Sequence, residues 1–208
     1  MAEADLDGQV RAADPDRWLS SRLVADPALR ADLIALYAFE AELSAIPKRV
    51  TQPLLAEMRF TWWAEQLDGV FAGEPRKGHP VLEALAAAVA GRGLQRAPLE
   101  ALIDAHLYRA HGRSHDLEAL FTGPAVEAAR LLGVPEPELA APAGRLWGLI
   151  QTGQFEAARA LRPEANRVLK RLPAAAFPAL AHAALIDRDA PEPVKRLRLV
   201  WASLRGRV

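Results

Sequence analysis

Proline residues that directly follow a helix-capping side chain mark the starts of helices along this chain, and they constrain its fold more than any other feature. Asp14-Pro15 and Asp26-Pro27 are the clearest cases. An aspartate side chain can accept a hydrogen bond from a free backbone N–H at a helix start, and proline suits the first turn because its missing N–H would have no partner there. Between such starts the chain is rich in Ala, Leu, Arg and Glu, which are good helix formers. Strand signals are nearly absent, so the sequence predicts an all-α fold.

The apolar residues recur mostly at three- and four-residue steps, which is typical of helices that bury one face. In the segment after Asp26 these positions are Leu29, Leu33, Ile34, Tyr37, Ala38, Ala41 and Ile46. Pro47 is expected to end that helix, and Pro163 to begin a late one. The expected helices cover residues 14–23, 26–46, 51–72, 80–91, 98–110, 116–132 with a break near 123–124, two segments within 135–172, 173–186 and 192–205.

The connections between these segments are short, which favours one bundle of neighbouring antiparallel helices. A chain of 208 residues is long enough for one sizeable core. We expect a flexible N-terminus over residues 1–13 and one helical domain over residues 14–208.

Charge and composition exclude several classes of function. The 26 Lys and Arg residues balance the 26 Asp and Glu residues, so no global field favours nucleic acid. The absence of cysteine excludes disulfides, thiolate nucleophiles and cysteine-ligated zinc. The N-terminal residues resemble neither a signal nor a transit peptide, and no run approaches the ~20 apolar residues of a spanning helix. We expect a cytoplasmic protein, either free or peripheral to the inner face of a membrane.

Several blocks occur in the order found in squalene and phytoene synthases. The segment SSRLVADPALRADLIALYAFEAEL resembles the opening of that family, EMRFTWWAEQLDGVFAG with GHPVLEAL resembles the next block, and LQRAPLEALIDAHL the one after it. The resemblance covers most of residues 16–133. It implies a single-domain helical bundle of the isoprenoid synthase type, here shortened at its C-terminal side.

The family resemblance also implies a chemistry. Its members join two isoprenyl diphosphates head to head in an apolar tunnel, with two aspartate-rich motifs at the mouth. These motifs hold Mg²⁺, which binds hard oxygen ligands and stabilises the departing diphosphate.

This chain departs from the family pattern at both motifs. Alignment through Tyr37 places the first pair of expected aspartates at Ser44 and Lys48, which are poor ligands for Mg²⁺. Glu40 and Glu42 point to different faces of a helix and do not replace them. The stretch comparable to the second motif, residues 144–169, contains no aspartate. The resemblance therefore implies a family member with no resident metal and no cofactor, unless unorthodox ligands hold Mg²⁺.

The resembling blocks supply the candidate pocket residues, namely Ser21, Arg22, Tyr37, Phe39, Glu42, Arg59, Trp62 and Trp63. Trp62 and Trp63 should face about 100° apart, so that one enters the core and the other lies at its edge. An apolar tunnel lined by Trp62, Phe39 and Phe60 is an alternative to ordinary core packing. We also hypothesise an ion pair between Arg59 and Glu42 that closes the former metal site.

Other polar clusters have simple interpretations. The pairs Glu65/Asp68 and Glu100/Asp104 could bind a cation, but solvated acidic helix faces are common. The histidines His106, His111 and His115 could form a metal site with Asp104, and the alternative is a role at the surface or at a helix end.

The C-terminal segment, residues 193–208, is basic and places Val194, Leu197, Trp201 and Leu204 on one helical stripe. Two interpretations remain open: an interfacial helix on anionic lipid, or a terminal helix docked on the bundle with its arginines outside.

Three functions follow from the resemblance. The first is a non-catalytic binding or assembly protein, in line with a resemblance of AF-x-x-EL and MR-x-x-WW-x-x-x-LD to the divergent branch that includes a mitochondrial complex I assembly factor. The second is an active prenyl-diphosphate transferase of isoprenoid biosynthesis. The third is an isoprenoid or lipid carrier. The expected partners are accordingly a protein or a lipid ligand.

Overall fold

The computed structural model describes residues 5–50, 52–114, 116–187 and 189–208. Over these residues the chain is built from helices and contains no β-strand, as the sequence predicts. The elements in order are α1 (Leu6–Ala13), α2 (Pro15–Ser21), α3 (Pro27–Arg49), α4 (Pro53–Ala72), α5 (Pro80–Arg92), α6 (Arg96–Ala110), the π-turn η1 (Glu118–Thr122), α7 (Gly123–Leu131), the 3-10 helix η2 (Pro137–Ala140), α8 (Ala141–Gln151), α9 (Phe155–Leu169), the 3-10 helices η3 (Ala174–Ala179) and η4 (Ala181–Ala184), and α10 (Glu192–Arg205).

The Asp-Pro helix starts are confirmed. A side-chain oxygen of Asp14 accepts the backbone N–H of Arg17 at 3.0 Å, and one of Asp26 accepts that of Ala28 at 2.8 Å. The predicted segments at α5, α6 and α10 agree with the structure to within two residues at each end. Local capping by Asp14 and Asp26 therefore marks where α2 and α3 begin.

Two prolines do not act as predicted. Pro47 lies inside α3, which continues to Arg49, and Pro163 lies inside α9, which already begins at Phe155. A proline inside a helix removes one backbone hydrogen bond. Pro47 is close enough to the helix end for this loss to matter little. Pro163 is exposed, so a water molecule can donate to the backbone carbonyl that would otherwise accept from its missing N–H.

The predicted flexible N-terminus is wrong for residues 6–13, which form α1; residues 1–4 lie outside the described part of the chain. Asp5 caps this helix, and Val10 is buried where α1 packs on α3. The indole N–H of Trp18 also donates to the carboxylate of Asp7 at 2.8 Å. The buried Val10 and the side-chain hydrogen bonds and ion pairs that α1 forms with α2 and α3 thus order a segment whose composition is polar.

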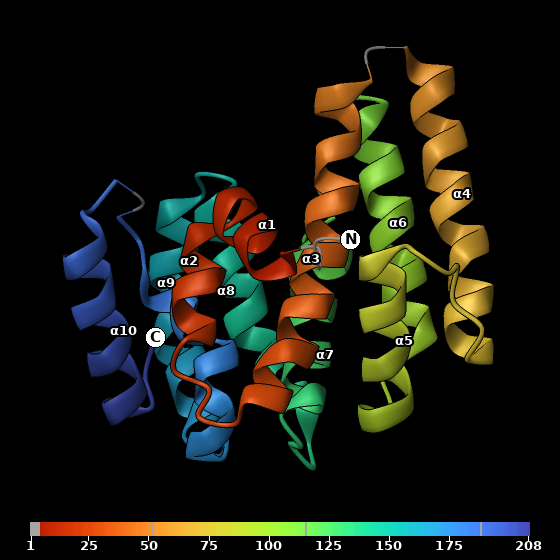
Figure 1. Cartoon of the computed structure of the whole chain (residues 1–208). Helices are drawn as coiled ribbons and strands as arrows, with labels where there is room; N and C mark the ends of the chain where they lie inside the picture. Colours follow the sequence, from red (N-terminus) through yellow and green to blue (C-terminus); the bar gives the residue numbers. More distant parts are fainter. Residues whose placement is uncertain (1–4, 51, 115, 188) are drawn as a thin grey trace.

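The helices form one body around a continuous core (Figure 1). The long helices α3, α4 and α6 run alongside one another, α5 packs against α3 and α4, and α8 packs against α9. Helix α10 lies at the opposite edge of the molecule and contacts α2, η3 and η4. The largest fully buried side chains include Phe39, Phe60, Trp147 and Phe177. No helix in the described residues is long and apolar enough to cross a membrane.

The predicted helix over residues 173–186 is replaced by the short 3-10 helices η3 and η4. Pro178 lacks an N–H and disfavours the α conformation at the residue before it, which interrupts a regular helix. The segment is nevertheless buried, and its carbonyls accept hydrogen bonds from other elements. The hydroxyl of Tyr37 donates to the carbonyl of Ala179 at 3.2 Å, and that of Ser20 donates to the carbonyl of Pro178.

Candidate functional site

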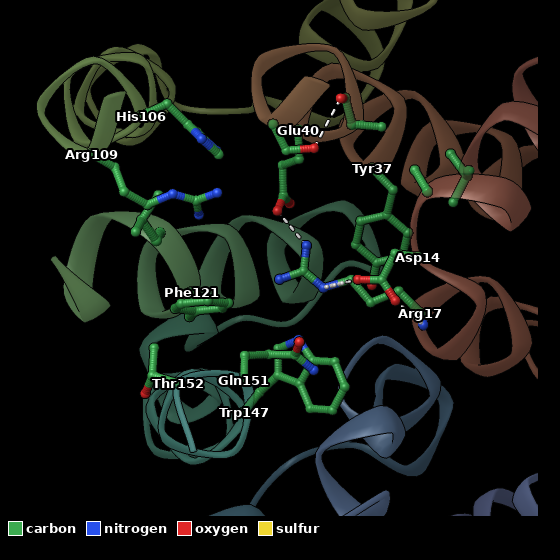
Figure 2. Close-up of a pocket in the computed structure, with 15 residues that line it drawn as sticks. Asp14, Arg17, Tyr37, Glu40, His106, Arg109, Phe121, Trp147, Gln151 and Thr152 are labelled. Carbon is green, nitrogen blue, oxygen red and sulfur yellow. Dashed lines mark hydrogen bonds and ion pairs between the residues drawn. The ribbon is translucent and has the colours of Figure 1, made fainter. Parts of the chain in front are cut away.

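A cavity of about 340 Å³ opens between α2, α3, α6, η1 and α8, in the size range of small-molecule sites (Figure 2). It has an unusual density of polar and aromatic side chains for the interior of a helical protein. The lining residues are Val10, Ala13, Asp14, Arg17, Tyr37, Glu40, Ala41, Ser44, His106, Arg109, Leu120, Phe121, Trp147, Gln151 and Thr152.

Helix α3 contributes Tyr37, Glu40 and Ser44 to the cavity. Steps of three and four residues bring these side chains to one face of the helix. The same helix buries Leu36 and Phe39 on other sides, so its position is held by the core. The polar face is therefore presented to the cavity by a rigid element.

Arg17 lies at the centre of the polar cluster (Figure 2). Its guanidinium forms a buried ion pair with Glu40, lies 3.7 Å from the Asp14 carboxylate and stacks over the Tyr37 ring at 5.3 Å. Burial alone would lower the pKa of Arg17, but the negative charges of Glu40 and Asp14 outweigh it and raise that pKa. Burial raises the pKa of Glu40, against the opposing effect of Arg17. The guanidinium is therefore a permanent cation held inside the protein.

His106 and Arg109 enter the same cavity from α6 (Figure 2). His106 is buried, and burial together with the nearby charges of Arg109 and Arg17 lowers its pKa to about 3. His182 is also buried, with its ring 5.0 Å from that of Trp147, and burial and Arg17 lower its pKa as well. Both histidines are neutral near pH 7. The predicted surface role is therefore wrong for His106.

Helix α8 forms the opposite wall through an unusually close approach to η1. A Cβ atom at Gly144 would lie 2.6 Å from the backbone oxygen of Phe121, and one at Gly148 would lie 2.8 Å from the ring of Phe121. These two glycines, one helical turn apart, let α8 pack directly on the π-turn. That packing presents Trp147 and Gln151 to the cavity, with Thr152 just beyond the helix end. π-Turns are frequent at functional sites.

Comparison with protein families gives a match to the squalene/phytoene synthase model over residues 10–122, more than half of the chain. The chain belongs to the squalene/phytoene synthase family. No curated protein and no solved structure matches it. The family match ends at Thr122, the last residue of η1, so α8 and its share of the cavity lie beyond the matched region.

The two stretches that we compare with the family motifs both reach this cavity. Ser44 lines it from the first, and Gln151 and Thr152 line it from the stretch comparable to the second. The Ser44 hydroxyl donates to the carbonyl of Ala41 at 3.0 Å, and Lys48 is exposed outside the cavity. The two stretches compared with the family motifs thus line one cavity, and neither contributes a carboxylate to it from these positions.

The side chains present do not fit a magnesium clamp. The cavity has two carboxylates, Asp14 and Glu40, and both lie against the Arg17 guanidinium. Among the described residues, no group of three or more Asp, Glu, His or Cys side chains converges to hold a metal ion. A cation at the centre of the cavity also opposes the approach of a divalent metal.

Of the eight candidate pocket residues, Tyr37 alone lines this cavity. Ser21 is buried and donates to the carbonyl of Trp18 at 2.7 Å, and Phe39 packs edge-on against Trp63 in the core. Arg22 forms an ion pair with Asp7 of α1.

The other four candidates, Glu42, Arg59, Trp62 and Trp63, line a separate groove of about 480 Å³ between the ends of α3 and α4. Trp63 is buried and Trp62 half-buried, as their angular separation predicts. The hypothesised ion pair between Arg59 and Glu42 is wrong. Glu42 instead accepts from Gln9 at 2.5 Å and pairs with Arg49 at 3.3 Å, while Arg59 is exposed.

The remaining acidic and histidine clusters bring no three potential metal ligands together within the part of the chain that the structure describes. Asp68 and Glu100, one from each predicted acidic pair, both pair with Arg96, at 2.6 and 2.7 Å. His111 faces Glu57 at 3.1 Å, away from His106, and His115 lies outside the described residues. The interpretation as solvated acidic faces is thus confirmed for these pairs.

Sequence reasoning missed most of the cavity, including Arg17, His106, Arg109 and Trp147. The spacing of Tyr37, Glu40 and Ser44 could have indicated the cavity, because it places three side chains with polar groups on one face of a helix that is otherwise mostly apolar. The Gly144 and Gly148 pair was a second signal, since two glycines one turn apart mark a close helix contact.

Proposed function

We propose that this protein is a non-catalytic binding protein built on the squalene/phytoene synthase scaffold. One observation supports the proposal: the stretches that we compare with the two family motifs line one cavity with Ser44, Gln151 and Thr152, and the two carboxylates of that cavity lie against Arg17. Ionisation of an allylic diphosphate needs fixed positive charge on the leaving group, which the family takes from magnesium. This cavity offers Arg17 and Arg109, and Arg17 is already neutralised by Glu40.

The cavity suits a small polar ligand. Arg17 Nε, Glu40 Oε1 and His106 Nδ1 are buried and have no hydrogen-bond partner among the described residues. Buried polar atoms normally have partners, and a polar ligand or water molecules could supply them. Tyr37, Phe121 and Trp147 add aromatic surface around the same space.

The carrier alternative is less favoured. Of the three residues expected to line an apolar tunnel, Phe39 and Phe60 are fully packed in the core, and Trp62 lines the groove between α3 and α4. The cavity around Arg17 combines charged and polar side chains with aromatic ones. An assembly role, in which the scaffold supports the biogenesis of a respiratory complex, remains the cellular setting that the resemblance to the divergent branch favours.

The test is incubation of the purified protein with farnesyl or geranylgeranyl diphosphate in the presence and absence of Mg²⁺. We expect no release of pyrophosphate, and any binding of the diphosphate should be independent of Mg²⁺. A phytoene synthase assayed in parallel provides the positive control. Turnover that depends on Mg²⁺ would refute the proposal and establish the transferase alternative.

A further inference from the structure

Helix α10 is fixed to the rest of the protein by one face only. Lys195, Leu199 and Ala202 are buried there, and the Lys195 ammonium donates to the Asp16 carboxylate of α2 at 2.8 Å. Both side chains of this ion pair are at most 10% exposed. The rotation of α10 about its own axis is therefore set by a specific buried contact.

The opposite face of α10 is apolar and exposed, and we call its four residues, Val194, Leu197, Trp201 and Leu204, the ridge. Leu197 is 70% exposed, Leu204 78% and Trp201 54%. At 100° per residue these positions lie on the side of the helix away from Leu199 and Ala202. A docked terminal helix normally turns such a stripe inward, so the docking of α10 through its other face calls for an explanation.

Exposed arginines flank the ridge. Arg198 and Arg205 lie on one side of it and Arg196 on the other. The Arg205 guanidinium stacks 4.0 Å above the Trp201 ring, and that cation faces no carboxylate within 4 Å among the described residues. Arg196 pairs with Glu192 on the surface, and Arg198 lies 3.9 Å from Asp187. Apolar and cationic side chains therefore share the exposed surface of α10. This helix lies at the edge of the molecule (Figure 1).

We propose that the ridge inserts into the surface of an anionic lipid bilayer, with Arg198 and Arg205 contacting lipid headgroups. Leucine and tryptophan side chains enter the boundary between headgroups and acyl chains, while long arginine side chains keep their charge at headgroup level. Charge complementarity favours this occupant, because an apolar protein surface would leave Arg205, which faces no carboxylate within 4 Å among the described residues, without an anionic partner. The two interpretations of the sequence then apply to two faces of one helix: one face docks and the other binds lipid. This proposal does not depend on the proposed non-catalytic role of the cavity.

The test is co-sedimentation of the full chain with phosphatidylcholine vesicles that contain or lack about 30 mol% phosphatidylglycerol. This lipid supplies the anionic headgroups that attract basic interfacial helices. We expect binding to the anionic vesicles that weakens with added salt. The double variant Leu197→Glu/Leu204→Glu should lower the partition coefficient by at least about tenfold, because two leucine side chains no longer enter the apolar layer.

The matched control is Leu54→Glu/Met58→Glu on α4. Leu54 and Met58 are 67% and 60% exposed, close to the ridge leucines, but they lie in a different helix. This control should bind vesicles as the unchanged protein does. The second variant, Arg198→Gln/Arg205→Gln, should lower binding to anionic vesicles about fivefold or more and leave the residual binding less sensitive to salt.

Two results would overturn the proposal. One is equal loss of binding in the α4 control and the ridge variant, which would mean nonspecific adsorption of exposed leucines. The other is absence of vesicle binding together with a dimer in sedimentation velocity that only the ridge variant dissociates. In that case a second copy of the chain, and not lipid, covers the ridge.

Discussion

Helix α3 presents two carboxylates two residues apart to two different environments. Glu40 is 9% exposed and meets the buried guanidinium of Arg17, whereas Glu42 is half-buried and meets Gln9 and the exposed Arg49. A helix turns about 200° over two residues, so the two carboxylates point away from each other. Glu40 and Glu42 therefore cannot act together on one ion, and each already forms its own ion pair.

The Glu40 face and the Glu42 face of α3 differ in whether their buried polar atoms have hydrogen-bond partners. On the cavity face, Arg17 Nε and Glu40 Oε1 are buried without a hydrogen-bond partner. Around Glu42 the ion pair reaches solvent, where water satisfies the remaining lone pairs. Buried polar atoms cost free energy unless something pairs with them. Apolar side chains at these positions are often as stabilising as a buried ion pair or more so, so stability alone does not account for the charges on the cavity face.

The largest expected effect comes from Glu40→Gln. This change keeps the shape of the side chain but leaves the Arg17 cation with Asp14 as its remaining carboxylate, 3.7 Å away. Removing one partner of a buried ion pair typically costs about 3 kcal/mol or more. Urea denaturation of the variant beside the unchanged protein measures the loss in the free energy of unfolding.

A double variant separates charge from shape. Arg17→Met/Glu40→Leu removes both charges, and it should recover most of the stability that Glu40→Gln loses, because no buried ion is left unpaired. If the double variant is as unstable as Glu40→Gln, packing around the cavity determines the stability at this site more than the ion pair does. Burial of an ion pair would then no longer distinguish Glu40 from Glu42.

The next effect is a pH dependence to which His106, on the wall of the cavity, contributes. The pKa of His106 is lowered to about 3 in the folded protein, below the ordinary value of about 6.5 in the unfolded chain. Between these values the unfolded chain binds a proton that the folded protein does not, so stability falls as the pH falls. From pH 7 to pH 5 the loss is about 2 kcal/mol for this one group.

The measurement is the free energy of unfolding of the unchanged protein and of His106→Gln at pH 7 and pH 5. The variant should lose less stability on acidification, by about the same 2 kcal/mol. His182, whose pKa is also lowered by burial, keeps part of the pH dependence in both proteins. Identical losses in the two proteins would show that His106 is protonated in the folded state.

Local chemistry made the fold predictable, and long-range contacts made the site hard to predict. At Asp14-Pro15 and Asp26-Pro27 the capping hydrogen bond that begins the helix joins residues at most three positions apart. In contrast, Arg17 meets Glu40 across 23 residues, and Lys195 meets Asp16 across 179. The second contact decides which face of α10 docks. Periodicity finds an apolar stripe on that helix but carries no information about the side of the helix on which the partner lies.

A smaller effect is expected at Glu42→Gln. The side chain is partly solvated, and its ion pair with Arg49 involves a largely exposed arginine. Surface ion pairs contribute up to about 1 kcal/mol, and the amide can still accept a hydrogen bond from Gln9. The variant should therefore lose at most about 1 kcal/mol in urea denaturation, with a salt dependence that fades above physiological ionic strength.

The smallest effect is expected at Arg59→Ala. This variant tests whether an arginine on the Glu42 side of α3 forms a stabilising ion pair. If an arginine closed the groove between α3 and α4 by pairing with Glu42, its loss would cost as much as the loss of a buried partner. Arg59 is exposed and forms no ion pair within 4 Å in the described residues, so the free energy of unfolding should change by no more than about 0.5 kcal/mol. Arg59→Lys serves as a control for side-chain bulk. A loss of about 3 kcal/mol would instead show that Arg59 forms a buried ion pair in the groove, and the contrast between the groove and the cavity around Arg17 would fail.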